Sequence, residues 1–171
     1  FADARAVEET ARHLDIESLE TVAEAMAAAS RIELFGVGAS GFVALDLQGK
    51  LHRIGRRAYA WLDTHAALAS AALLSKGDVA FGISHTGATA DTIDVLTEAR
   101  SRGATTVALT NFPRSPVAGV VDHVLTTAAR ETTFRSGATA SRIAQLTVVD
   151  CLFVAVARRH YRETLRALEA T

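Results

Sequence analysis

Five short apolar runs divide this chain of 171 residues, and stretches with a helical pattern separate each run from the next. The predicted strands are residues 31–37, 57–62, 79–83, 105–110 and 123–126. Strands that alternate with helices are joined by right-handed crossovers, which build a parallel sheet with helices on both faces. We therefore predict an α/β fold, a three-layer αβα sandwich around a five-stranded parallel sheet.

Helical periodicity accounts for the rest of the chain. Apolar residues recur every three or four positions in residues 3–14 and, after a break at 15–18, again up to Met26, which we expect in the core. Asp63 or Thr64 is suited to cap the start of a later helix, and Gly103 to end another. The further predicted helices are residues 40–54, 64–74, 89–101, 116–120, 137–158 and 160–169.

Two loops rich in glycine and hydroxyl side chains follow the first and third predicted strands. Residues 36–41 read Gly-Val-Gly-Ala-Ser-Gly, and residues 84–89 read Ser-His-Thr-Gly-Ala-Thr. Each loop leads into a predicted helix, whose first backbone N–H groups lack partners within the helix and attract anions. Ligands of doubly wound sheets bind beyond the carboxyl ends of the strands, where the strand order reverses. We expect the two loops to meet there and to bind a phosphate group.

Other interpretations of the first loop are weaker. Its spacing Gly36-x-Gly38-x-x-Gly41 fits a dinucleotide-binding pattern, which also needs an acidic residue about 20 positions later. Asp63 lies at that distance but is at least as well explained as a helix cap. In the simplest alternative, Ser40 only caps the helix that it begins. A Walker-type nucleotide site is improbable because the sequence has no Gly-Lys-Ser or Gly-Lys-Thr.

Composition narrows the class of protein. The formal net charge of -1 gives the chain no overall attraction for nucleic acid. We find no run of about 18 apolar residues that would span a membrane, and no signal-peptide pattern. The single Cys151 lies in an apolar helical run and is expected to be a buried structural thiol, compatible with a reducing compartment. The six histidines lack ligand spacing, so we predict no metal site and no cofactor.

Three motifs, taken in order, resemble the sugar isomerase (SIS) domain: residues 36–41, residues 83–89, and residues 131–138 with 141–146. The third motif, Phe134-Arg135-Ser136-Gly137 followed by Ser141-Arg142-Ile143, is most similar to the version at the C-terminal end of bacterial RpiR-type transcriptional regulators. The resemblance covers about residues 15–160. It implies the flavodoxin-like form of the predicted sandwich.

The resemblance also implies a function. Residues 1–171 would form a single cytoplasmic effector domain that binds a phosphorylated sugar or sugar acid and so controls DNA binding. DNA would be contacted only through an N-terminal helix-turn-helix domain that is absent here, which agrees with a chain that starts at Phe1 without Met. The resemblance places the phosphate on hydroxyl groups of the two loops. The expected ligand-binding residues are Gly38, Ser40, Ser84, His85, Thr86, Thr89 and Glu131.

Two positions depart from the family pattern. Family members commonly carry Ser where this chain has Thr86, so the hydroxyl is kept. They often carry Glu, Lys or Arg where this chain has Ala88, so one polar ligand contact is absent. Arg135 is suited to pair a carboxylate of the ligand, although a helix-start or subunit-interface salt bridge explains it equally well.

The same fold hosts isomerases, so an enzyme is the alternative. Aldose–ketose isomerisation needs a base that moves a proton between adjacent carbons, and Glu131 and His85 are the candidates. Glu131 is equally suited to accept hydrogen bonds from sugar hydroxyls or to be a solvated carboxylate, and the ring of His85 to lie outside the pocket. A purely structural dimerisation module is the third possibility. We favour the sensor and assign no catalytic residue.

Surplus apolar surface predicts self-association. The predicted helix 137–158 has more apolar positions than one face against a sheet would use, and residues 3–29 add further apolar surface. We therefore expect a homo-oligomer, a dimer or a tetramer, without a membrane partner.

Overall fold

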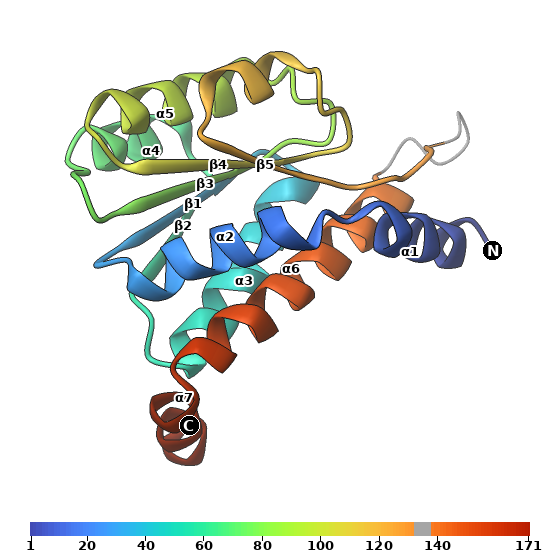
Figure 1. Ribbon diagram of the computed structural model, residues 1–171. Helices are drawn as coiled ribbons and strands as arrows, with labels where there is room; N and C mark the ends of the chain where they lie inside the picture. Colours follow the sequence, from blue (N-terminus) through green and yellow to red (C-terminus); the bar gives the residue numbers. More distant parts are fainter. Residues whose placement is uncertain (132–137) are drawn as a thin grey trace.

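A computed structural model describes residues 1–131 and 138–171 and contains the predicted parallel sheet (Figure 1). Its strands are β1 (Ile32–Gly36), β2 (Ala58–Trp61), β3 (Val79–Ile83), β4 (Thr105–Thr110) and β5 (His123–Thr126). All neighbouring strands are parallel, in the order β2-β1-β3-β4-β5. The order reverses between β1 and β3, so the predicted switch point is confirmed.

The helices form two layers and a flanking pair. They are α1 (Ala2–His13), α2 (Ile16–Ala28), α3 (Ala39–Arg53), α4 (Thr64–Ala71), α5 (Ala90–Ser101), α6 (Thr139–Arg159), α7 (Tyr161–Ala170) and the 3₁₀ helix η1 (Pro116–Val120). Helices α4 and α5 cover one face of the sheet, and α2, α3 and α6 cover the other (Figure 1). Helices α1 and α7 lie near opposite ends of α6. The three-layer sandwich is confirmed.

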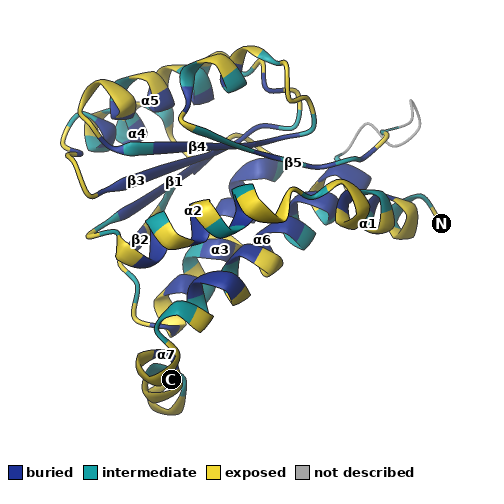
Figure 2. Cartoon of the chain, viewed as in Figure 1, coloured by how far each residue is buried: buried dark blue, intermediate teal, exposed yellow. Residues whose placement is uncertain are grey.

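Each face of the sheet has its own apolar core, because side chains alternate between the faces of a strand. On β1, Leu34 packs with the α2, α3 and α6 layer, while Phe35 packs with α4 and α5. Met26 belongs to the first core and is fully buried, as predicted. In Figure 2 the dark, buried residues fill the sheet and the inner sides of the helices.

Helix α6 corrects two expectations. An 18-residue window of α6 has a mean hydropathy of 1.6. By length and composition alone, the helix is therefore long and apolar enough to cross a membrane. Half of that window is buried within the protein, and Val148 and Leu152 belong to the first core, as in the core helix of a soluble protein. Cys151 was expected to be buried and is exposed. Val148 and Leu152 face the sheet, and Cys151 lies on the outer side of the helix.

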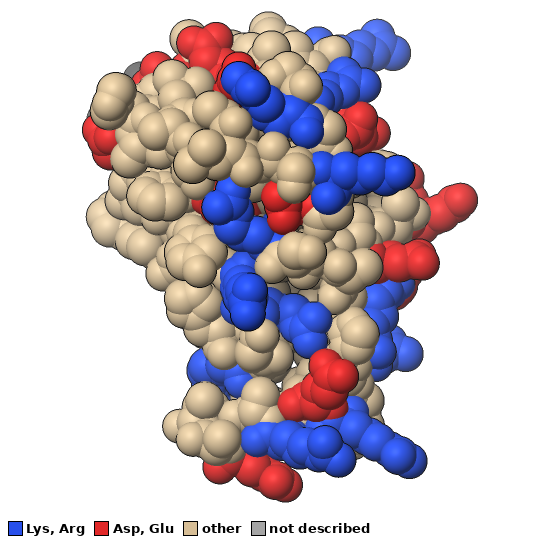
Figure 3. All heavy atoms as spheres, turned by 90° about the vertical axis from the view of Figure 1, so that its left-hand side faces the viewer, with Lys and Arg blue, Asp and Glu red and all other residues tan. Residues whose placement is uncertain are grey.

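Charged side chains of both signs are scattered among uncharged residues on the face at the amino ends of the strands (Figure 3). Some of them pair within the chain: Arg31 Nε lies 3.2 Å from Glu33 Oε1, and Arg100 Nε lies 3.2 Å from Asp122 Oδ1. This edge of the sheet is therefore a charged surface with internal pairing. The two hydroxyl-rich loops lie at the other edge.

Candidate functional site

The 84–89 loop follows β3 and holds its hydroxyl groups in defined positions. Ser84 is buried, its Oγ accepts a hydrogen bond from the Gly87 N–H (3.1 Å), and it lies 3.0 Å from Thr89 Oγ1. One proton suffices for the bond between these two hydroxyls, so the other remains for a ligand. The Oγ1 of exposed Thr86 accepts from the Ala88 N–H (3.2 Å) and likewise keeps its own proton.

The chain after β4 holds this loop in place. The His85 carbonyl accepts from the Asn111 N–H (3.0 Å) and from Thr110 Oγ1 (3.2 Å), and the Gly87 carbonyl accepts from the Val117 N–H (2.9 Å). Gly87 has a φ of +65°, and a Cβ there would lie 1.9 Å from Ser115 Oγ. Both the backbone conformation and the lack of space therefore require glycine.

The 36–41 loop follows β1 and lies beside the first loop, because Gly36 is in register with Ile83. Ser40 is buried, and Gln145 Nε2 of α6 donates to its Oγ (3.2 Å). Ser40 Oγ in turn donates to Gln145 Oε1 in a longer hydrogen bond of 3.5 Å. Ser40 does not cap α3, whose N-cap is Gly38 without a side-chain hydrogen bond. The alternative that Ser40 only caps the helix it begins is therefore wrong.

His85 and Glu131 lie close enough to interact electrostatically. Burial lowers the pKa of His85, and the Glu131 carboxylate opposes that shift. Glu131 Oε1 accepts from the Ser141 N–H in the first turn of α6 (2.7 Å). Among the described residues, Glu131 Oε2 and His85 Nδ1 are buried without a hydrogen-bond partner, as are Glu33 Oε1, Thr92 Oγ1 and Ser115 Oγ. Buried polar atoms are nearly always paired, so the first two, which interact electrostatically beside the 84–89 loop, are candidates for bonding to a ligand.

The segment that carries Glu131 is fixed from two sides. Asn111 Oδ1 accepts from the Ala129 N–H (2.7 Å), and its Nδ2 donates to the Ala129 carbonyl (3.1 Å). From α1, the Oγ1 of the fully buried Thr10 accepts from the Ala128 N–H (3.0 Å). Glu131 thus leaves a short stretch anchored to both β4 and α1.

Sequence reasoning missed Asn111 and Gln145 as parts of the site. Asn111 directly follows β4, and Gln145 is a polar residue within an apolar helix, so both were visible as exceptions to the pattern. Their partners could not be identified locally, because Gln145 and Ser40 are 105 positions apart. Arg135, the proposed carboxylate contact, lies outside the described residues. No group of three or more His, Cys, Asp or Glu that could hold a metal ion occurs within residues 1–131 and 138–171.

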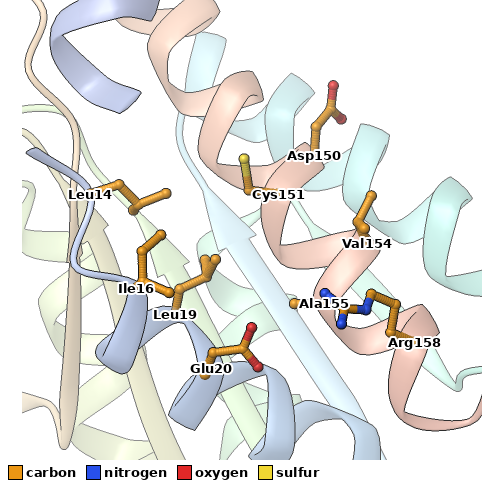
Figure 4. A pocket seen from close by; sticks show the side chains of 9 residues that line it. All are labelled: Leu14, Ile16, Leu19, Glu20, Asp150, Cys151, Val154, Ala155 and Arg158. Atoms are coloured by element: carbon orange, nitrogen blue, oxygen red, sulfur yellow. The ribbon is translucent and has the colours of Figure 1, made fainter. Parts of the chain in front are cut away.

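Two hollows lie near these elements, and neither is lined by the four loop hydroxyls. A cavity of about 900 Å³ lies between α1 and the segment that leads to Glu131, and Asn111, Thr127 and Arg130 line it. A groove of about 410 Å³ lies between the start of α2 and the outer side of α6 (Figure 4). The first is continuous with the segment that carries Glu131. The second lies on the outer side of the helical layer.

Comparison with known proteins identifies the family of the chain. The model of the SIS domain family matches residues 25–155. An uncharacterized HTH-type transcriptional regulator of Caldanaerobacter subterraneus subsp. tengcongensis is 47% identical over 167 residues. That match covers 98% of this chain and 59% of the relative, so the chain spans less than two thirds of that relative's length.

Solved structures of regulators have the same fold. The Vibrio vulnificus NanR protein complexed with ManNAc-6P superposes with a TM-score of 0.92 at 32% identity, covering 99% of this chain and 64% of that one. The sugar isomerase domain of the RpiR transcription factor from Sphaerobacter thermophilus superposes with a TM-score of 0.89 at 28% identity. That match covers 98% of this chain and 92% of the other.

Proposed function

The chain belongs to the SIS domain family, and we propose that it is the phosphosugar-binding effector domain of a transcriptional regulator. The 84–89 loop carries the proposal, because it presents hydroxyl protons at the switch point of the sheet, beside a second hydroxyl-bearing loop. NanR, which has the same fold, is a regulator complexed with a phosphorylated sugar. The predicted sensor function follows from these two observations together.

The phosphate lies on Ser40, Ser84, Thr86 and Thr89 in this proposal. Each hydroxyl accepts or shares a hydrogen bond within the protein, and the set still has protons to donate. The first backbone N–H groups of α3 and α5 add donors, and the positive ends of both helix dipoles favour the anion. Gly38 presents open backbone at the start of α3, since nothing lies within 4 Å of a Cβ built there.

The sugar lies toward His85 and Glu131. The free carboxylate oxygen of Glu131 is suited to accept from a sugar hydroxyl, and the unpartnered Nδ1 of His85 to exchange a hydrogen bond with another. Two unpaired polar atoms in a buried place discriminate well between ligands, because a ligand that leaves them unpaired loses free energy. These two residues therefore select the sugar, whereas the loops select the phosphate.

The output of the domain is control of DNA binding. The whole relatives are named as HTH-type regulators, and this chain corresponds to 59% of the first of them. We assign DNA contact to a helix-turn-helix domain preceding the residues seen here, and place the protein in the cytoplasm, where DNA and sugar phosphates are found. We expect ligand binding without a metal or cofactor.

Calorimetric titration tests the proposal, with ManNAc-6P as the first probe and unphosphorylated ManNAc as its partner. We expect heat only from the phosphorylated sugar. The double variant Ser84→Ala, Thr86→Ala should lose this heat of binding. The control variant is Thr97→Ala, at an exposed threonine on α5 away from the loop, and it should retain the heat of binding. Equal binding of both sugars, or unchanged binding by the double variant across a set of hexose phosphates, would refute the phosphate site.

An aldose–ketose isomerase is the second candidate, favoured by one observation. Glu131 has an unpaired carboxylate oxygen beside His85, whose pKa is lowered by burial, and such a pair can move a proton. The relatives named as regulators favour the sensor. Turnover of a sugar phosphate that Glu131→Gln abolishes would establish the enzyme, and binding without turnover over the same substrates would establish the sensor.

A further inference from the structure

Helix α1 is attached to the rest of the protein by few buried side chains. Of its 12 residues, only Ala6 and Thr10 are buried. Its N-cap residue, Phe1, makes no side-chain hydrogen bond to the helix, and isolated helices of this length are marginal in water. The helix therefore depends on the surface against which it packs, and a small change in that surface can loosen it.

One contact joins α1 to the segment that follows β5. Thr10 is fully buried, and its Oγ1 accepts a hydrogen bond from the Ala128 N–H (3.0 Å), 118 positions away. The side chain of Asn111 bonds to the backbone of the next residue in that segment, and its own backbone N–H donates to the His85 carbonyl (3.0 Å). A series of hydrogen bonds thus connects the 84–89 loop with α1.

A second contact joins α1 to the first turns of α6, where Glu131 is also bonded. Ala6 packs with Ala140 and Ala144 in a small cluster that is separate from the two main cores. Glu131 Oε1 accepts from the N–H of Ser141, the residue after Ala140 (2.7 Å). The Glu131 side chain therefore bridges the two pieces of chain on which α1 rests, the segment after β5 and the start of α6.

Space for movement lies on one side of this helix. The cavity of about 900 Å³ is lined by Arg5, Glu9 and His13 of α1 and by Thr127 and Arg130 of the segment after β5. Protein interiors are normally packed without voids of this size, and packed elements resist displacement. The cavity therefore lets α1 approach the segment or withdraw from it.

We propose that α1 senses the ligand. A sugar bonded to the unpartnered Oε2 of Glu131 holds this side chain, and with it the surface under α1, in the docked arrangement, whereas the empty site lets α1 loosen. The inference rests on the proposed function, because it concerns the regulation of the same site. In the proposed regulator, α1 lies between the DNA-binding domain and the site, so a change in its docking is suited to carry the signal. Coupling between two sites is reciprocal, so docked α1 also strengthens ligand binding.

Amide hydrogen exchange of the 171-residue chain, followed by mass spectrometry, is the first test. The first probe is ManNAc-6P, and other hexose and hexosamine 6-phosphates follow it. A bound sugar phosphate should slow exchange in α1 by about 10-fold, a coupling of ordinary size. Helix α7, which has one buried residue and lies near the opposite end of α6, is the internal control and should not change (Figure 1). Inorganic phosphate, which fits the loop hydroxyls without reaching Glu131, should leave exchange in α1 unchanged.

Thr10 offers a matched pair of variants. Thr10→Val leaves the Ala128 N–H without its acceptor, whereas Thr10→Ser keeps the hydroxyl oxygen. In Thr10→Val the sugar phosphate should no longer slow exchange in α1, and its affinity, measured by calorimetry, should fall by about 10-fold because the coupling is reciprocal. Thr10→Ser should retain both the protection and the affinity. A purely structural role for Thr10 would lower the melting temperature without changing either quantity.

A comparison without ligand separates this inference from the proposed function. Glu131→Ala removes the bond to the Ser141 N–H and should speed exchange in α1 by about 10-fold with no sugar present, whereas Asp63→Ala at the start of α4 should not. If no sugar phosphate binds, the proposed function fails, and the effect of Glu131→Ala alone decides whether α1 is coupled to the site. Unchanged exchange in α1 after a sugar phosphate binds, unchanged exchange in Glu131→Ala, or equal protection in Thr10→Val and Thr10→Ser would overturn the proposal.

Discussion

The helices of this sheet begin in two different ways. Helices α2 and α4 each start at an aspartate: Asp15 Oδ1 accepts from the Glu17 and Ser18 N–H groups (3.0 and 3.2 Å), and Asp63 Oδ1 accepts from the Ala66 N–H (2.7 Å). Helices α3 and α5 start at Gly38 and Thr89, and neither N-cap residue makes a side-chain hydrogen bond to the helix. The first pair of ends is closed, and the second pair is open.

Among these four helices, the uncapped ends are the two at the switch point. Helix α4 follows β2 and begins at the same carboxyl edge as α3 and α5, yet it is closed by Asp63. The open ends belong to the two helices that follow β1 and β3, the strands between which the order reverses. Helices α1, α6, α7 and the 3₁₀ helix η1 also lack a side-chain cap from their N-cap residue, so the contrast that sets α3 and α5 apart is the one with α4 at the same end of the sheet. At the switch point, these uncapped donors lie where a ligand binds in this class of sheet.

Closing an open end should have the largest effect. Thr89 has φ and ψ of -70° and 113°, suitable for an N-cap aspartate, so Thr89→Asp would cap α5 and bring a negative charge to the phosphate site. We expect the affinity for a sugar phosphate to fall by about 4 kcal/mol, roughly 1000-fold, through like-charge repulsion. The melting temperature without ligand should stay equal or rise. Calorimetry and thermal unfolding of one sample measure both quantities, and retained affinity would show that α5 does not face the phosphate.

The two glycines of these loops should differ, because only one of them has a steric clash. Gly87→Ala combines a positive φ with a Cβ that collides with Ser115, and should lower the free energy of unfolding by about 3 kcal/mol. Gly38→Ala has free space but φ and ψ of +58° and -127°, outside the left-handed helical region, and should cost about 2 kcal/mol. Urea unfolding of both variants gives the comparison. Equal losses would mean that the β4 side does not support the 84–89 loop.

Opening a closed end should cost stability and leave binding unchanged. Asp63→Ala removes the cap of α4 and should lower the free energy of unfolding by about 1 kcal/mol. Asp63→Asn, which retains a capping oxygen, serves as the control and should lose less. The affinity for a sugar phosphate should match that of the wild type in both, measured by the same titration. A change in affinity would indicate that the closed ends also serve the site.

The smallest expected effect is the pH dependence that His85 adds. Burial holds the pKa of His85 below its usual 6.5, so below that pH the unfolded chain takes up a proton that the folded chain resists. The stability contribution of neutral His85 is complete above pH 6.5 and is lost as the pH falls toward the lowered pKa. Urea midpoints between pH 5 and 7.5 should therefore fall less steeply in His85→Gln than in the wild type. If the midpoints of the variant and the wild type fall equally with pH, the ring of His85 lies in solvent.

Much of the fold follows from local patterns. The predicted strands 79–83, 105–110 and 123–126 match β3, β4 and β5 residue for residue, because each is an apolar or β-branched run between clear turn residues. Met26 and the cap at Asp63 were correctly predicted for the same local reasons. The position of the two loops follows from strand order, which alternation and crossover handedness constrain.

The errors arise where distant parts of the chain meet. Cys151 was placed in the core because α6 is apolar almost all round, and only the packed helix shows which side faces the sheet. The sequence could not exclude that Ser40 is only a helix cap, because its actual partner, Gln145, comes from another helix. The attachment of Glu131 to the Ser141 N–H likewise depends on how the chain returns to the start of α6. Sequence periodicity gives elements and faces, whereas these contacts need the assembled structure.

The most direct test of the sensor is a thermal-shift series with hexose and hexosamine 6-phosphates and the same sugars without phosphate. The account predicts that at least one phosphorylated sugar raises the melting temperature in proportion to the logarithm of its concentration, and that its unphosphorylated form has no effect. The shift should vanish in the double variant Ser84→Ala, Thr86→Ala. Equal shifts from both forms of a sugar, or a shift that survives in the double variant, would contradict the phosphate site between β1 and β3.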